Sequence, residues 1–359
     1  MTICFMIIVN TSGNGATTFA PLQHAAWHGF TPTDLVFPSF LFAVGNAQSF
    51  VAKKWAQTSR KDVVFKILKR IFFIFLVGYL MYWFPFFRVD DQRHIVVSPF
   101  GDTRIMGVLQ RIALAYGLAS LMIYFWKEKT VLVVTGLILL LYWPVLLYWG
   151  DPAGPLSLSG NAVLRLDSWL LGDRHLYHGE GIAFDPEGIL GTFPAIANVV
   201  VGFYIGKLLQ RRENKWESLV QIAFYGFLMV ALAFMWNYVF PINKKLWTSS
   251  FVLLTSGLDC LVLMSIVYWV DLLGHNKGVS FFLIPGRNPL IIYLFSELFI
   301  VVLSMIEIAP GINLYEWCFL RVFSHLTPYV GAFVQSVAYM LVCWSLGWWM
   351  DRRKLYVKL

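Results

Sequence analysis

TVLVVTGLILLLYWPVLLYW, residues 130–149, runs from Thr130 to Trp149 without a charged side chain. An α-helix rises about 1.5 Å per residue, so a run of this length matches the roughly 30 Å hydrocarbon core of a bilayer. A transmembrane β-strand would instead show about ten residues of alternating polarity. Because the run does not alternate, it predicts a transmembrane helix.

The composition extends this prediction to the whole chain. Hydrophobic residues make up 58% and charged residues only 13%, whereas a soluble domain carries about a quarter charged residues. Backbone groups in lipid must be hydrogen-bonded internally, which favours helices here. We predict an all-α fold, a polytopic membrane helix bundle of about ten transmembrane helices forming one integral-membrane domain over residues 1–359. The expected spans are residues 1–10, 34–52, 64–86, 105–126, 130–149, 188–209, 218–240, 248–272, 287–306 and 329–350. The first would rise only about 15 Å and is therefore expected to be a truncated helix.

The distribution of Lys and Arg predicts the orientation. One set of loops, including residues 53–70, 207–215 and 352–358, holds most of the 28 Lys and Arg residues. By the positive-inside rule this side, with the C-terminus, is cytoplasmic, and His24 and loop 150–187 face outward. The net charge of +8 is spread over separate loops, so we expect a lipid bilayer and no nucleic acid as partner. A homodimer is left open.

The four cysteines form no CxxC pair, so neither a disulfide framework nor a zinc ribbon is indicated. They are Cys4, Cys260, Cys318 and Cys343. We expect no metal.

The densest group of polar residues follows the first segment, in QHAAWHGFTPTDLVFPSFLFAVGN at residues 23–46. His24 and His28 are four residues apart, as two ligands on a helix would be, but no HExxH motif accompanies them. Asp34 can be read in two ways, as part of a catalytic group or only as the N-cap of the helix that follows. The residues alone leave both readings open.

Five ordered blocks of the sequence resemble the heparan-α-glucosaminide N-acetyltransferase family, and the resemblance covers nearly the whole chain. The family enzyme moves acetyl from cytosolic acetyl-CoA to the amine of a terminal glucosamine across the membrane. The blocks are QHAAWHGFTPTDLVFPSFLFAVG at 23–45, IMGVLQRIALAYG at 105–117, FDPEGILGTFPAI at 184–196, NKKLWTSSFVL at 243–253 and IPGRNPLIIYL at 284–294. The family's large luminal domain is absent, so the chain is similar to compact bacterial members located in the inner membrane. The family's first core helix starts with a basic segment, so we expect an upstream extension carrying a basic residue and an Arg-Gly pair.

The resemblance implies three catalytic residues. His24 matches the family's proposed catalytic histidine, Asn10 the asparagine beside it, and Asp34 the aspartate after the Trp-containing turn. A histidine can take a proton from an attacking amine, and an Asn amide can donate to a developing oxyanion. Asp34 could orient His24. An acetylated His24 intermediate is the alternative to direct transfer.

Acetyl-CoA must be reached from the cytoplasm, which implies a tunnel within the bundle. We expect Arg111, a charged residue within a span, to line it, with pairing to Asp259 or Glu297 as the alternative. Arg287 and Asn288 could meet the CoA phosphates, or Arg287 could be a topology anchor.

The acceptor side is expected at Asp185 and Glu187, whose carboxylates could bind an ammonium sugar or could equally cap a helix. His28 is assigned to the same side.

We therefore predict an acetyl-CoA-dependent N-acetyltransferase that acts on an extracytoplasmic amino sugar, with acetyl-CoA as co-substrate. A transporter or permease is the rival class, because intramembrane polar residues also line substrate paths. Against it, no inverted repeat and no pair of Gly/Pro-broken helices in matching halves is visible. O-acetylation of a cell-surface glycan is the third alternative.

Overall fold

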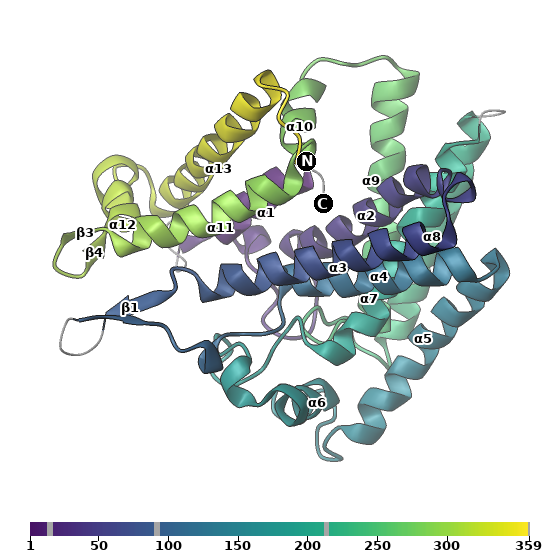
Figure 1. The fold of residues 1–359 in the computed structure, drawn as a ribbon, viewed down its shortest axis with the longest axis horizontal. Coiled ribbons are helices and arrows are strands. Elements are labelled where there is room, and N and C mark those ends of the chain that lie inside the picture. Colours follow the sequence, from purple (N-terminus) through teal and green to yellow (C-terminus); the bar gives the residue numbers. More distant parts are fainter. Residues whose placement is uncertain (13–16, 90–93, 212–214, 358–359) are drawn as a thin grey trace.

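The computed structural model describes residues 1–12, 17–89, 94–211 and 215–357, and it is an all-α polytopic bundle with only two short hairpins (Figure 1). The α-helices are α1 (Thr2–Asn10), α2 (Val36–Ala52), α3 (Arg60–Trp83), α4 (Val108–Phe125), α5 (Glu128–Trp149), α6 (Ala162–Leu171), α7 (Ile189–Leu209), α8 (Lys215–Asn237), α9 (Ser249–Val267), α10 (Val279–Gly286), α11 (Pro289–Met305), α12 (Leu314–Cys318) and α13 (Pro328–Arg352). Short 3₁₀ or π turns are η2 (Ala20–Leu22), η3 (Pro32–Leu35), η4 (Trp55–Gln57), η5 (Phe100–Asp102), η6 (Asp173–His175), η7 (Tyr268–Leu272) and η8 (Phe319–Phe323). The strands are β1 (Phe87–Val89), β2 (Ile95–Val97), β3 (Glu307–Ala309) and β4 (Ile312–Asn313).

Every predicted span coincides with a helix, but fewer helices meet the requirements for crossing a membrane. Among the described residues, 7 are long and apolar enough, and 8 if one bent pair is a single span. The all-α polytopic fold is confirmed, with 7 or 8 helices passing this test of length and composition against about ten expected spans. α1 has only 9 residues, and α3 carries Lys66, Lys69 and Arg70 in its first half.

The bent pair consists of α10 and α11, which meet at an angle of 80°. The sequence between them reads PGRNP, and the proline at each side of the break restricts the backbone there. The predicted span 287–306 is therefore only the second half of a broken element.

The core of the bundle is the pair α2 and α7, which pack together along their length. Gly45 and Gly202 allow this close approach, because a Cβ at either would collide with the backbone of the other helix. Small residues at such contacts are typical of helix packing in lipid. α7 is 78% buried over its span, against 28% for α5 and α8, so α7 is central and the latter two face the lipid.

Other long helices pack in pairs beside α2 and α7. α3 packs on α4, and α8 packs on α9. The hairpin β1–β2, which pairs Phe87 with Val97, lies near one end of α3, and β3–β4 lies with α12 at the same side of the molecule, on the left in Figure 1. α6 and the loops around it cover the site described next.

Candidate active site

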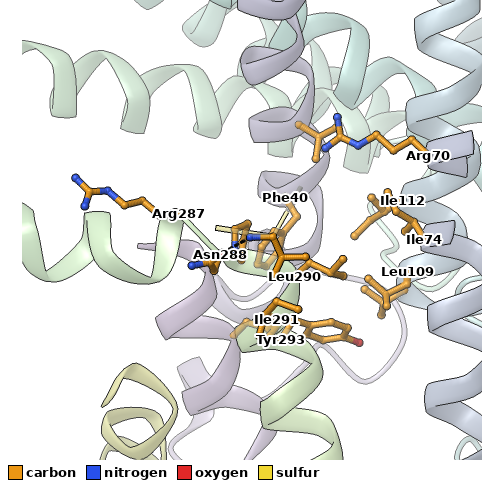
Figure 2. A pocket seen from close by; sticks show the side chains of 15 residues that line it. Phe40, Arg70, Ile74, Leu109, Ile112, Arg287, Asn288, Leu290, Ile291 and Tyr293 are labelled. Atoms are coloured by element: carbon orange, nitrogen blue, oxygen red, sulfur yellow. Dashed lines mark hydrogen bonds between the residues drawn. The ribbon is translucent and has the colours of Figure 1, made fainter. Parts of the chain in front are cut away.

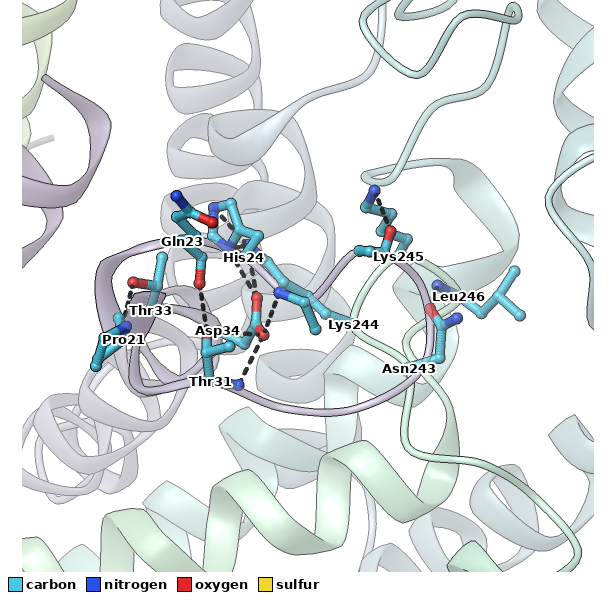
Figure 3. Close-up of polar contacts among 12 residues, drawn as sticks. Pro21, Gln23, His24, Thr31, Thr33, Asp34, Asn243, Lys244, Lys245 and Leu246 are labelled. Atoms are coloured by element: carbon cyan, nitrogen blue, oxygen red, sulfur yellow. Dashed lines mark hydrogen bonds and ion pairs between the residues drawn. The ribbon is translucent and has the colours of Figure 1, made fainter. Parts of the chain in front are cut away.

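The loop before α2 is folded tightly around Asp34. Thr31 and Asp34 form a capping box at η3, with Asp34 Oδ2 accepting from the Thr31 backbone N–H at 3.0 Å. The same oxygen accepts from Ala25 N at 3.2 Å, and Oδ1 contacts His24 Nδ1 at 2.7 Å (Figure 3). Asp34 therefore acts as a helix cap and as the partner of His24 at once.

This arrangement fixes the form of His24. Asp34 is buried, with 1% of its side chain exposed, whereas 45% of the His24 side chain is exposed. A carboxylate against Nδ1 holds the proton on that nitrogen, which leaves the lone pair on Nε2. His24 thus presents a basic nitrogen at an accessible position, held by a buried anion.

Lys244 is the third member of this group, and the sequence alone predicted no role for it at the site. Its Nζ lies 3.1 Å from His24 Nδ1 and 3.2 Å from Nε2, and 3.8 Å from Asp34 Oδ1. Burial lowers the pKa of Lys244, while the charges of Asp34 and Glu187 oppose that shift. Nζ is therefore nearly equidistant from the two ring nitrogens of His24.

His28 joins the first loop to the segment that carries Lys244. Its Nδ1 lies 3.3 Å from Asn243 Nδ2, and the neighbouring Gly29 N–H donates to the Ile242 carbonyl at 2.8 Å. Burial lowers the pKa of His28, which favours the neutral ring. These contacts show His28 in the wall of the site, with no contact to Asp34.

The DPEG segment lies against an arginine from another loop. Arg104 donates to both carboxylate oxygens of Asp185, at 2.8 and 2.7 Å, and to Glu187 Oε2 at 2.6 Å. The rings of Tyr82 and Tyr177 lie against its guanidinium, each 4.8 Å away. These carboxylates raise the pKa of Arg104 despite its burial, so the arginine stays charged.

We call the contacts of Arg104 with Asp185 and Glu187 the clamp. They leave the two carboxylates with different amounts of free charge. Asp185 is fully buried and uses both oxygens on Arg104, so little of its charge is left for an ammonium. Glu187 uses only Oε2 there. The alternative that these residues cap α7 is not realised, because Asp167 of α6 accepts from the first N–H of that helix, Ile189 N, at 3.0 Å.

Arg111 is fully buried in α4, as expected for a charged residue that avoids lipid. It donates to the Gly188 carbonyl at 2.9 Å and lies 4.8 Å over the Trp247 ring. The alternative pairing with Asp259 or Glu297 is absent. Its Nε and Nη1 have no partner among the described residues.

The two in-span carboxylates have other partners. Asp259 accepts from Ser39. Glu297 accepts from the Asn10 amide at 3.4 Å. Within the described residues no hydrogen bond joins Asn10 to His24, so its role at an oxyanion stays a prediction.

A cavity of about 410 Å³ lies between α2, α3, α4 and α11 (Figure 2). Most of its lining is apolar, and its polar lining comprises Arg70, Arg287 and Asn288, with Tyr293 further along α11. Arg70 and Arg287 lie on opposite sides of it (Figure 2). Arg111 is not in the lining, although the next residue, Ile112, is. The expectation that Arg111 lines an acetyl-CoA tunnel therefore stays a prediction.

The arginines of the cavity differ in their partners. Arg287 pairs with Asp351 at 2.5 Å. The side-chain amide of Asn288 donates to Leu355 O at 2.8 Å and accepts from Val357 N at 3.0 Å. Arg70 lies over the Tyr116 ring and its Nε has no partner among the described residues. Arg70 was counted only toward topology from the sequence.

No protein-family model matches the chain. It is 27% identical to the heparan-alpha-glucosaminide N-acetyltransferase of Mus musculus over 351 residues, and 28% identical to that of Homo sapiens over 352 residues. It is a distant relative of these acetyltransferases. The matches cover 83% of this chain in each case, and 52% and 51% of the two relatives. The chain thus spans about half the length of the curated acetyltransferases it matches.

For a relative of membrane acetyltransferases, the structure brings together part of the predicted site. His24 and Asp34 are in contact, and Lys244 joins them from a loop far along the chain. Arg287 and Asn288 line a cavity in the bundle. Within the described ranges, no three His, Cys, Asp or Glu side chains gather so as to hold a metal ion.

Proposed function

We propose that this protein transfers an acetyl group from cytosolic acetyl-CoA to the amine of a glucosamine-type sugar on the extracytoplasmic side of an inner membrane, with its C-terminus cytoplasmic. The observation that carries the proposal is the contact of the exposed His24 with the buried Asp34 at 2.7 Å, in a chain related to two enzymes named for this acetyl transfer.

His24 is the general base in this reaction. The acceptor nitrogen attacks the thioester carbonyl carbon while His24 Nε2 takes a proton from the amine, and a tetrahedral oxyanion forms. When the carbon–sulfur bond breaks, the proton passes from His24 to the departing CoA thiolate. The products are the acetylated amine and free CoA. Asp34 keeps the Nδ1 proton in place throughout, and Asn10 is the proposed oxyanion donor.

The cavity of about 410 Å³ is the proposed passage for the acetyl-CoA arm. Its apolar walls suit the pantetheine chain, and Arg70 and Arg287 suit the phosphates, which arginine binds through paired N–H groups. The N–H of Val108, in the cavity lining, donates to the Tyr82 hydroxyl at 3.4 Å, and the Tyr82 ring lies against Arg104, so the apolar passage is near the polar group at the acceptor side. Glu187 and His28 are proposed to bind the sugar. Arg111 is proposed to hold the segment that carries Glu187 through its hydrogen bond to the Gly188 carbonyl.

The test uses purified protein with radiolabelled acetyl-CoA and glucosamine. His24→Ala should abolish transfer and leave the acetyl-CoA thermal shift intact, because His24 is outside the cavity lining. The matched control is His275→Ala, which removes the same side chain from the loop before α10, outside the site, and should retain full activity. Full acetyl transfer by the His24→Ala variant would overturn the proposal. If the protein acetylates only hydroxyl groups of the acceptor, its reaction is O-acetylation.

A transporter is the second candidate, and the break between α10 and α11 favours it. Broken helices at a cavity build the substrate sites of many transporters, and here the 80° bend lies at Asn288 in the lining. Reconstituted protein that accumulates labelled sugar without acetyl-CoA would support transport. Sugar that is modified only when acetyl-CoA is present supports the enzyme.

A further inference from the structure

Lys244 touches His24 more closely than any other cation among the described residues. Its Nζ lies 3.1 and 3.2 Å from the two ring nitrogens, and only 17% of its side chain is exposed. Because Nζ is nearly equidistant from Nδ1 and Nε2, it lies beside the imidazole ring and not on the outward lone pair of Nε2. The Nε2 lone pair therefore stays open, with a cation next to the ring that must take a proton from the acceptor.

The loop that carries Lys244 is held rigidly. Asn243 Oδ1 accepts from Leu246 N at 2.8 Å, and its backbone N–H donates to the Thr248 hydroxyl at 3.0 Å. Trp247 is fully buried with a φ of 52°, in the left-handed region, which only a strongly determined environment holds for such a bulky residue. A fixed backbone keeps the ammonium from moving away from His24.

The charges around this pair balance one another. Asp34 contacts His24 at 2.7 Å and lies 3.8 Å from Lys244 Nζ. The charge of Glu187, in the segment before α7, also acts on Lys244. Lys245 and Arg111 are the other cations that act on Lys244. Lys245 is itself paired with Glu180 at 2.5 Å.

This balance matters because a histidine beside a buried carboxylate would otherwise tend to stay protonated. An imidazolium has no lone pair and cannot act as a base. With Lys244 present, the negative charge of Asp34 is already compensated, and a second proton on His24 would add an uncompensated positive charge. A like charge at this distance disfavours that form.

We propose that Lys244 is a positioning residue for His24, whose ammonium disfavours the imidazolium and keeps the Nε2 lone pair available to the acceptor amine near neutral pH. The benefit of this contact for catalysis rests on the proposed function, but the effect of Lys244 on the protonation of His24 can be measured without turnover. The acceptor amine approaches the open Nε2 lone pair, and the ammonium remains near Asp34.

The experiment follows the reaction of diethyl pyrocarbonate with His24, because only neutral imidazole is modified. The rate is measured by mass spectrometry against pH in the intact protein, with fragment ions separating His24 from His28. In Lys244→Met the pH midpoint should rise by about one unit. Lys244→Arg, which keeps the charge, and Lys245→Met, which removes a neighbouring charge, should keep the wild-type midpoint.

An unchanged or lowered midpoint in Lys244→Met would overturn the inference, as would an equal rise in Lys245→Met, since the effect would then be general. Lys244→Gln serves in the same way if the methionine variant does not fold. In the transfer assay, the acidic limb of kcat/KM should move with the midpoint while the KM for acetyl-CoA stays constant. A protein that shows the midpoint shift but acetylates no acceptor would refute the proposed function and leave the electrostatic inference standing.

Discussion

Replacing Asp34 with asparagine separates the two tasks of that carboxylate. Oδ2 accepts from Ala25 N, Thr31 N and the Thr31 hydroxyl at 3.2, 3.0 and 3.1 Å. An asparagine oxygen can keep these bonds and therefore the loop. Its amide NH₂ would then face His24 Nδ1, where the 2.7 Å contact requires an acceptor on the Asp34 side.

The amide forces the imidazole into the other tautomer. With NH₂ donating to Nδ1, the ring proton moves to Nε2, and the lone pair needed for the acceptor amine is lost. General base catalysis contributes about 10²–10⁴-fold to rate, so kcat should fall by this amount. Loss of a hydrogen bond that involves a charged group costs about 1.5–3 kcal/mol of unfolding free energy, which is small enough for the protein to remain folded.

The assay compares kcat and KM for acetyl-CoA in wild type, Asp34→Asn and His275→Ala, with melting temperatures measured beside them. We expect kcat to fall in Asp34→Asn alone, with KM for acetyl-CoA unchanged because Asp34 is outside the cavity lining. Turnover within severalfold of wild type in a folded Asp34→Asn would refute the orientation of His24 by Asp34.

Three further predictions concern residues around this pair. Arg70→Gln should weaken acetyl-CoA binding by about tenfold or more, since one charge-assisted bond is worth about 1.5–3 kcal/mol; calorimetric titration measures it, and unchanged affinity would place the phosphates elsewhere. Arg104→Lys should lower the free energy of unfolding, because a point charge cannot replace the bidentate contact with Asp185; equal melting temperatures would argue against the clamp. Burial raises the pKa of Asp167 to about 7, so the folded state binds more protons than the unfolded state up to that pH, and stability should decline as pH rises from about 4 to about 7. Asp167→Asn should remove this decline in a series of melts against pH, and a wild-type slope in the variant would contradict it.

Much of the fold could be predicted because long apolar runs have only one solution in lipid. All ten predicted segments are helices, within a few residues at most ends. The short helices α6 and α12 and the two hairpins were missed, because they lie between the long helices where neither length nor periodicity distinguishes them. The broken pair was missed because the predicted span began at residue 287, and the short helix α10 before it was not predicted.

The candidate site could be predicted only in part. His24 and Asp34 are ten residues apart and share one motif, and their contact is local. Lys244 reaches the same ring from a loop 220 residues away, and one sequence contains no signal for that proximity. Its occurrence in the NKKLW block was the only hint. Arg111 was correctly expected inside the bundle, but the choice of partner depended on side-chain directions that the sequence does not give.

Acetyl transfer across a membrane is tested most directly by reconstituting the protein into sealed vesicles. Acetyl-CoA labelled in the acetyl group is supplied on one side and glucosamine only on the other, with vesicles sorted by the orientation of the C-terminus. We expect labelled N-acetylglucosamine on the sugar side when acetyl-CoA faces the C-terminus, and none with His24→Ala. Product that forms only when both substrates share one side, or that forms equally in His24→Ala, would contradict it.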